Sequence, residues 1–359
     1  MYKLKKEQLN DLYTVLQRTY KIYGPEVSEE SEQVMFNKID DLLKISLNAP
    51  IPHNPPKDVL LPQMETVMRY DYDSKTKDLD LKMTVMNEPT ALIGLKSCDL
   101  EGILCLDRFF LGQEYVDDIY LEHRKNLFIV TITCNTPYDQ CFCVCTDSGP
   151  SATENYDMNL TNMGDYYFCE IGSEVAEKIA NELNLEKAVP EDKAKKEEVV
   201  NKSIYSFDDE AKENKAWISR VMNRITTGFI KPEVWEYIGN RCFECGGCSF
   251  VCPSCSCFNI EDVNSSGTGD VKITSSRLRT WDSCSFEGYS RMAGDHNPRQ
   301  PVEDRRNKRF FCKLSYSQSK KYLRPGCVGC GRCARVCPGD IGLPNVVTYI
   351  RREMEETNE

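Results

Sequence analysis

The sequence predicts an α+β fold, with an N-terminal α/β domain over residues 1–185 and a cysteine-rich domain over residues 241–359. Segments with strand and helix patterns alternate through about the first 170 residues, which is typical of α/β units. A charged stretch follows, and the density of cysteines rises sharply after Arg241. The length of 359 residues allows two or three domains. Residues 186–240 are therefore expected to be a charged helical linker.

The N-terminal domain is expected to begin with helices, because apolar residues recur at helical spacing over residues 4–16 and 34–45. Prolines within residues 50–56 end this pattern. The strands predicted next cover residues 65–72 and 79–86, joined as a hairpin, and then residues 91–95 and 127–133. A helix over residues 100–109 separates the last two strands in a βαβ-like pattern. An amphipathic helix over residues 173–185 follows, with a serine as its N-cap.

Composition excludes several classes of protein. The formal charge is 45 − 56 = −11, so the chain as a whole is a poor partner for nucleic acid. No apolar run approaches the roughly 20 residues that a membrane span needs. The charged first residues lack the apolar core of a signal peptide. We therefore expect a cytoplasmic protein that neither binds nucleic acid nor inserts into a membrane.

Cysteine is the unusual residue of this chain, since nineteen of 359 residues are Cys and only three are His. Disulfide scaffolds belong to secreted chains, which are usually much shorter. An odd number of cysteines in a chain expected to stay inside the cell therefore favours metal ligation. A chain rich in cysteine and poor in histidine suits iron–sulfur clusters better than histidine-containing zinc sites.

Two cysteine runs share one spacing, C-x2-C-x2-C-x3-C-P. Three thiolates at this spacing can wrap three corners of a cubane, and in two-cluster ferredoxins the fourth cysteine ligates the other cluster. The expected ligand sets are therefore crossed: Cys242, Cys245, Cys248 and Cys337 for the first [4Fe–4S] cluster, and Cys327, Cys330, Cys333 and Cys252 for the second. Zinc ribbons, the alternative, use separate C-x2-C knuckles. The C-terminal domain is thus predicted to be a bacterial-type, two-cluster ferredoxin-like domain.

The connection between the two runs, residues 253–326, is a long insertion for a ferredoxin-like domain. Residues 271–326 hold thirteen Lys and Arg against five Asp and Glu, or +8, which leaves −19 for the rest of the chain. One interpretation is a solvated basic surface that balances the cluster charge, and the other is a docking face for an acidic partner subunit. Cys255, Cys257 and Cys284 also fall here, either as buried cysteines packed beside a cluster or as ligands of an extra one.

A third [4Fe–4S] cluster is predicted in the N-terminal domain, with Cys98, Cys134, Cys141 and Cys143 as ligands. Cys98 and Cys134 follow the two strands of the βαβ-like unit, and such strand ends gather along one crevice of an open α/β sheet. Cys141 and Cys143 lie in a loop close enough to fold back over the same crevice. Reduced structural cysteines are one alternative, and a zinc ion bound by the same four thiolates is another.

Motifs for nucleotide binding and hydrolysis are missing. No complete G-x-G-x-x-G follows a strand, and no P-loop or H-E-x-x-H occurs. The three histidines are scattered and form no acid–base constellation. We expect the chain to carry electrons, to bind neither flavin nor NAD, and to catalyse no reaction by itself.

The motifs resemble those of one family. The duplicated runs, Cys252-Pro-Ser-Cys-Ser-Cys257-Phe, Arg279-Thr-Trp-Asp-Ser-Cys284, the stretch 292–299 and Cys141-Phe-Cys143 look like the iron–sulfur subunit of anaerobic sulfite reductase. They are nearly as similar to the β subunit of soluble sulfhydrogenases, a sister family. The resemblance spans about residues 90–345.

The resemblance implies an iron–sulfur relay between a flavin subunit that oxidises NAD(P)H and a siroheme subunit that reduces sulfite to sulfide. An electron relay of the β-subunit type in a soluble hydrogenase or another flavin-linked complex is the first alternative. An iron–sulfur redox sensor is the second, although no module for binding DNA or an effector is found.

Two positions depart from the family pattern. Cys145 stands where the family has a small hydroxyl residue, so Cys145 could replace one of the four chosen ligands of the third cluster. Phe311-Cys312-Lys313 replaces an expected His-Lys pair, which points to a different contact with a partner.

Overall fold

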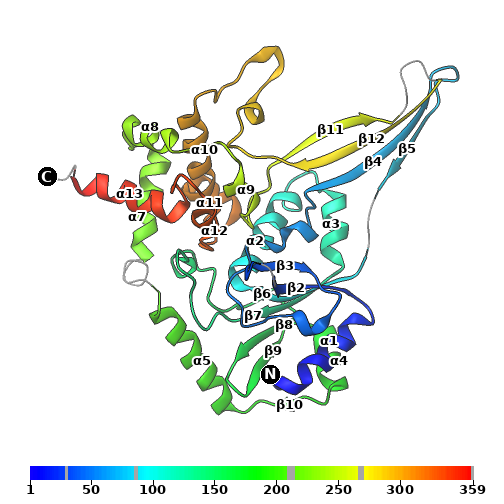
Figure 1. Ribbon diagram of the computed structural model, residues 1–359, viewed down its shortest axis with the longest axis vertical. Helices are drawn as coiled ribbons and strands as arrows, with labels where there is room; N and C mark the ends of the chain where they lie inside the picture. Colours follow the sequence, from blue (N-terminus) through cyan, green and yellow to red (C-terminus); the bar gives the residue numbers. More distant parts are fainter. Residues whose placement is uncertain (29–30, 85–87, 208–214, 266–270, 357–359) are drawn as a thin grey trace.

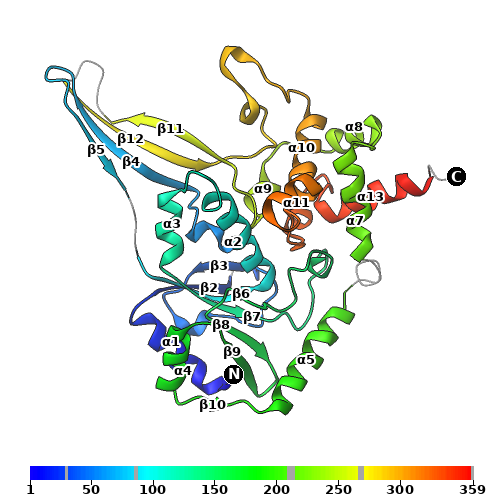
Figure 2. The same cartoon turned by 180° about the vertical axis from the view of Figure 1, so that it is seen from behind.

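The fold is built on a mixed sheet of eight strands (Figures 1 and 2), in a computed structural model that describes residues 1–28, 31–84, 88–207, 215–265 and 271–356. The strand order is β10-β1-β9-β8-β7-β6-β2-β3. Strands β2, β6, β7 and β8 run parallel to one another, and the other pairs are antiparallel. The bounds are β1 Tyr2–Lys5, β2 Lys21–Val27, β3 Val34–Lys38, β6 Thr90–Lys96, β7 Leu127–Ile132, β8 Met158–Asn162, β9 Tyr166–Ile171 and β10 Glu186–Lys187.

Helices cover both faces of this sheet. The helices concerned are α1 (Leu9–Gln17) and α4 (Glu174–Glu182) on one face, and α2 (Ser97–Phe110) and α3 (Asp118–Lys125) on the other. Within β6, Ala91 and Ile93 belong to the first core and Leu92 to the second, because successive side chains of a strand point to opposite faces. Every residue of β6 is buried. The βαβ unit formed by β6, α2 and β7 therefore lies at the centre of the N-terminal part.

A second sheet of four strands projects from the body as an arm (Figures 1 and 2). Its order is β11-β12-β4-β5, with the bounds β4 Met64–Asp73, β5 Leu79–Met83, β11 Phe258–Asn264 and β12 Lys272–Trp281. β12 pairs antiparallel with β4, so a hairpin of the basic insertion continues a hairpin of the N-terminal part. The two predicted domains consequently share a sheet, and the domain limits proposed from the sequence stay a prediction.

Most of the remaining helices gather around the two cysteine runs, whereas α5 packs against β9 of the large sheet. Their bounds are α5 Pro190–Tyr205, α7 Lys215–Thr227, α8 Pro232–Asn240, α9 Gly247–Phe250, α10 Val302–Leu314, α11 Tyr316–Tyr322, α12 Arg332–Arg335 and α13 Leu343–Glu356. One apolar core contains Trp217 of α7, Trp235 of α8, Phe310 of α10 and Val347 of α13, together with Cys330. Trp217 and Trp235 of this core lie in the range 186–240 that the sequence predicts to be a charged helical linker.

Several segments predicted from the sequence have the expected structure. β4, β6, β7 and α2 occupy the predicted ranges, and Ser173 caps α4 by accepting a hydrogen bond from the backbone N of Ala176. The predicted strand 79–86 ends at Met83 as β5, and its residues 85–86 lie outside the described residues. Among the described helices, none combines the length and the apolar character that a membrane crossing requires.

The prediction of helices through the first 50 residues is wrong for most of that stretch. Only α1 is a full helix, whereas β1, β2 and β3 are strands. Residues 34–45 form β3 and one 3-10 turn, Leu42–Lys44. β1 lies between β9 and β10, which come more than 150 residues later. Such pairing with distant strands overrides local periodicity, because the sheet completes the backbone hydrogen bonds of these residues.

Candidate metal centres

The two cysteine runs fold in the same way. In each run a glycine with left-handed backbone precedes a one-turn helix: Gly246 (φ 74°) before α9, and Gly331 (φ 74°) before α12. A Cβ at Gly331 would also lie 2.7 Å from the carbonyl oxygen of Gln140, so any larger residue would be strained there. The repeated spacing in the sequence therefore produces a repeated local structure.

The first group of thiols comes from both runs. Cys242, Cys245 and Cys248 line one cavity together with Cys337 of the second run. The backbone N of Glu244 donates to Cys242 Sγ at 3.4 Å, and Arg306 Nη1 donates to Cys248 Sγ at 3.7 Å. Hydrogen bonds of this kind stabilise negative charge on cluster sulfurs. The cavity thus brings one thiol of the second run to three of the first, and crossed ligation by these four stays a prediction.

The second group joins Cys327, Cys330 and Cys333 to Cys252 of the first run. The thiol of Cys252 is close enough to interact electrostatically with all three. Backbone N–H groups donate to two of the sulfurs, from Gly329 to Cys327 Sγ at 3.3 Å and from Leu343 to Cys333 Sγ at 3.3 Å. One thiol of this second group comes from the other run, and its role as a ligand likewise stays a prediction.

The thiols of the second group differ in the direction in which their pKa is shifted. Burial raises the pKa of Cys327 well above its ordinary value and that of Cys333 to about 12. A hydrogen bond from Cys255, together with Lys313 and Arg309, holds the pKa of Cys252 well below its ordinary value. Ligand thiols must lose their protons when a metal centre binds, so a cluster held by these thiols would release protons as it assembles.

The third group lies at the carboxyl end of the large sheet, where the sequence predicts it. Cys98, Cys134, Cys141 and Cys143 line one cavity of about 380 Å³. Cys98 and Cys134 are close because β6 and β7 are parallel and end side by side, with Lys96 of β6 opposite Ile132 of β7. Burial raises the pKa of all four thiols, and that of Cys141 to about 12.

Cys145 lies close to the third group in the sequence but does not line its cavity. Its side chain is buried in the apolar core that surrounds the cysteine runs, and its backbone N donates to the carbonyl oxygen of Phe142 at 2.9 Å. Cys105 on α2 and Cys169 on β9 are core residues as well. The cavity therefore favours the four cysteines chosen from the sequence over Cys145.

The third group contacts the second directly. The thiol of Cys141 donates to the carbonyl oxygen of Cys330 at 3.5 Å, and the backbone N of Phe142 donates to that of Gly329 at 2.8 Å. A Cβ at Gly329 would lie 2.6 Å from Cys143 Cα. Because the second group shares its two runs with the first, the three groups form one connected series.

Comparison with known proteins identifies the region that holds the first two groups. Residues 241–341 match the family of 4Fe–4S dicluster domains. This region is a 4Fe–4S dicluster domain. The chain is also 27% identical, over 352 residues, to sulfhydrogenase 2 subunit beta of Pyrococcus furiosus, and the match covers 97% of this chain and 98% of that protein. No solved structure matches the chain. This similarity to the β subunit of a sulfhydrogenase agrees with the resemblance seen in the motifs.

The cysteine arrangement bears on the choice between clusters and single metal ions. None of the nineteen cysteines, all of which are described, forms a disulfide. In the described ranges no three His, Cys, Asp or Glu side chains are placed to hold a single metal ion. A zinc ion draws its thiolates to about 2.3 Å from one centre, whereas a cubane spreads them over four corners. For the first two groups, the match to 4Fe–4S dicluster domains is the finding that supports clusters.

The basic insertion is folded into the dicluster domain. Five of its cations are buried, namely Arg279, Arg305, Arg306, Arg309 and Lys313. The interpretation of the insertion as a solvated basic surface is therefore wrong for these residues. Sequence analysis missed their burial because a basic stretch is usually exposed. The packing of α10 against the cysteine runs buries four of them, whereas Arg279 lies on β12. Two of the five, Arg279 and Arg305, pair with the carboxylates of Glu65 and Glu244.

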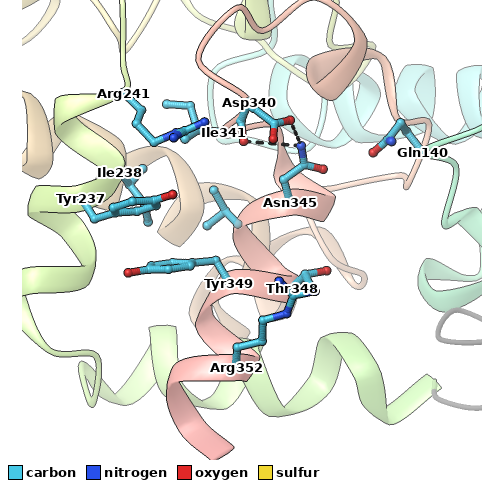
Figure 3. A pocket seen from close by; sticks show the side chains of 11 residues that line it. Gln140, Tyr237, Ile238, Arg241, Asp340, Ile341, Asn345, Thr348, Tyr349 and Arg352 are labelled. Carbon is cyan, nitrogen blue, oxygen red and sulfur yellow. Dashed lines mark hydrogen bonds between the residues drawn. The ribbon is translucent and has the colours of Figure 1, made fainter. Parts of the chain in front are cut away.

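A polar cavity of about 410 Å³ lies beside the dicluster domain, between α8 and α13 (Figure 3). Tyr237 and Tyr349 stack there with ring centroids 4.4 Å apart, and Arg241 lies over the ring of Tyr237. The cavity shares Ile341 with the first group of thiols. Its lining contains no cysteine or histidine, so we assign it no metal and no reaction.

Proposed function

We propose that this chain is the electron-relay subunit of a multi-subunit oxidoreductase. Its clusters would carry electrons between a flavin subunit that oxidises NAD(P)H and a separate catalytic subunit. The observation that carries the proposal is the connected series of three cysteine groups, two of them within a 4Fe–4S dicluster domain. The coarse function, that of an iron–sulfur electron-transfer subunit, agrees with the similarity to a sulfhydrogenase β subunit.

In this proposal each group of thiols holds one [4Fe–4S] cluster. The ligands of the first are Cys242, Cys245, Cys248 and Cys337, and those of the second are Cys327, Cys330, Cys333 and Cys252. The third cluster would take Cys98, Cys134, Cys141 and Cys143. The cubanes supply one-electron chemistry, while the chain supplies the thiolates, the N–H donors at Cys242, Cys327 and Cys333, and the dry surroundings.

The first group of thiols is the group best exposed for exchanging electrons with a partner subunit. Cys245 is exposed, and its neighbour Phe243 is 70% exposed. The four thiols of the third group lie deeper, since Cys98 and Cys143 are buried and Cys134 and Cys141 partly so. Because the rate of electron transfer falls steeply with distance, a cluster near the surface is the natural point of contact for a partner subunit.

The identity of the catalytic partner separates two candidate functions. The full-length similarity to a sulfhydrogenase β subunit favours a hydrogenase-type partner. The motifs around Cys257, Cys284 and Cys143 resemble the iron–sulfur subunit of anaerobic sulfite reductase and favour a siroheme partner that reduces sulfite.

Co-purification of the native complex from anaerobic cell extract tests the proposal. The bound partners are analysed for flavin, for nickel and for the visible absorbance of siroheme. Flavin with nickel supports the hydrogenase-type complex, and flavin with siroheme supports sulfite reduction. A chain that purifies alone, with neither flavin nor a catalytic partner, would contradict the relay function and favour a redox sensor.

A further inference from the structure

Four cysteines lie together outside the three groups described above. They are Cys255, Cys257, Cys284 and Cys312. Cys257 directly precedes β11, and Cys284 follows β12 by three residues. The two strands pair with Phe258 opposite Trp281, and the backbone N of Asp282 donates to the carbonyl oxygen of Cys257 at 3.1 Å. The foot of the β11–β12 hairpin therefore holds Cys257 beside Cys284.

The thiols at this foot are in contact. Cys257 and Cys284 are hydrogen-bonded to each other, and the phenol of Tyr289 is hydrogen-bonded to Cys257. Cys255 is two residues before Cys257, and the ammonium of Lys57 interacts electrostatically with both thiols. The thiol of Cys312 on α10 is close enough to interact electrostatically with that of Cys257. One hairpin foot and one helix thus supply four thiols around the same three cations, Lys57, Arg309 and Lys313.

Buried positive charge surrounds these thiols. The side chains of Lys57, Arg309 and Lys313 are 3%, 4% and 4% exposed. Arg309 Nη1 donates to Cys255 Sγ at 3.8 Å, and Lys57 Nζ donates to the carbonyl oxygen of Cys255 at 3.2 Å. Lys313 Nζ donates to the carbonyl oxygen and the hydroxyl of Ser254, at 3.1 and 2.9 Å.

Within the part of the chain that the structure describes, no carboxylate pairs with Lys57, Arg309 or Lys313, and their hydrogen-bond acceptors are carbonyl, hydroxyl and thiol groups. By contrast, the buried Arg279 is paired with Glu65 and Asp117. A buried charge is costly unless an opposite charge or a metal centre compensates it. The site therefore calls for an anionic group beside Cys255.

We propose that Cys255, Cys257, Cys284 and Cys312 bind a fourth [4Fe–4S] cluster, with Arg309, Lys313 and Lys57 as its buried counter-charges. Four soft thiolates are the donor set of zinc or of an iron–sulfur cluster. The cations favour the cluster, because a cluster gains negative charge when it is reduced and buried cations compensate that charge. Cys255 is also hydrogen-bonded to Cys252 of the second cluster. The fourth cluster lies beside the dicluster pair, on the side of the arm.

Metal counting on the full-length chain tests this proposal. Iron, acid-labile sulfide and zinc are measured per chain after anaerobic reconstitution of the wild type, C257S, C312S, and the double variant C257S/C312S. Each variant should lose about four iron and four sulfide, and the double variant should lose no more than either single variant, because both residues hold the same cluster. C169S, a buried core cysteine on β9, is the control and should lose none.

A second comparison separates this cluster from the third. The double variant C98S/C257S should lose about eight iron atoms, since the two residues hold different clusters. Unchanged iron in both C257S and C312S would overturn the proposal, and the three cations would then serve the dicluster pair alone. Loss of one zinc in place of four iron atoms would overturn it equally.

Discussion

Asp99 and Arg332 form an ion pair in which both side chains are only 1% exposed. Arg332 Nη2 donates to Asp99 Oδ2 at 2.9 Å, and Arg332 Nε donates to the carbonyl oxygen of Pro52 at 2.7 Å. Asp99 follows Cys98 at the start of α2, and Arg332 lies between Cys330 and Cys333. The pair therefore fastens the third group of thiols to the second, and the dicluster domain to the large sheet.

Replacing Asp99 with Asn should destabilise the protein strongly. The substitution leaves the guanidinium of Arg332 buried without its counter-charge, a change that typically costs about 3–5 kcal/mol. The free energy of unfolding, measured anaerobically by urea titration, should fall by that amount. The matched control is Glu182→Gln, which breaks the exposed pair of Glu182 with Arg18, whose side chains are 51% and 62% exposed. That variant should lose less than about 1 kcal/mol, and equal losses for the two variants would refute the structural role of the buried pair.

Replacing Gly329 with Ala should disturb the contact between the second and third groups. The added Cβ would lie 2.6 Å from the backbone of Cys143, at a residue with φ of 63°, and neither feature suits an L side chain. The thermal unfolding midpoint should fall by several degrees, and iron should be lost. Gly288→Ala is the control, because nothing lies within 4 Å of its added Cβ. A Gly329→Ala protein with the iron content and midpoint of the wild type would show that the contact is not tight.

Paired substitutions test the crossed ligands of the dicluster domain. If Cys242 and Cys337 hold one cluster, C242S/C337S should lose about four iron atoms relative to the wild type, no more than either single variant. C242S/C252S should lose about eight, because Cys252 belongs to the other cluster. Uncrossed ligation predicts the reverse pattern, so iron analysis of these two double variants distinguishes the two arrangements.

The third cluster has a test of the same kind. The C98S/C134S variant should lose about four iron atoms per chain, with the C169S control unchanged. The dicluster domain should keep its iron, since its ligands come from other residues. Wild-type iron content in C98S/C134S would leave the N-terminal part as a docking platform without a cluster of its own.

The sequence predicts much of the site because its chemistry is local. Six of the eight expected dicluster ligands lie within two short loops, and their fixed spacing determines the grouping. The third group is predictable for another reason, since Cys98 and Cys134 directly follow two apolar strands whose ends meet in a parallel sheet. In both cases a short stretch of sequence determines which thiols lie together.

The features that the sequence does not predict depend on contacts between segments that are distant in the chain. β1 is a strand because β9 and β10 lie on either side of it, and no local pattern in residues 1–8 indicates that pairing. The cations of α10 look like a solvated surface in the sequence, yet Arg309 and Lys313 are buried because the helix packs against the cysteine runs. The group formed by Cys257, Cys284 and Cys312 likewise appears only when the hairpin foot meets α10.

The most direct test of the relay function follows the reduction of the reconstituted chain under anaerobic conditions. A reduced low-potential dye should bleach the visible cluster absorbance, with about one electron taken up per [4Fe–4S] cluster. NADH alone should leave the absorbance unchanged, and NADH with sulfite should yield no sulfide, because the chain carries electrons between partners. Reduction of the clusters by NADH alone, or sulfide produced from NADH and sulfite by this chain alone, would contradict the account.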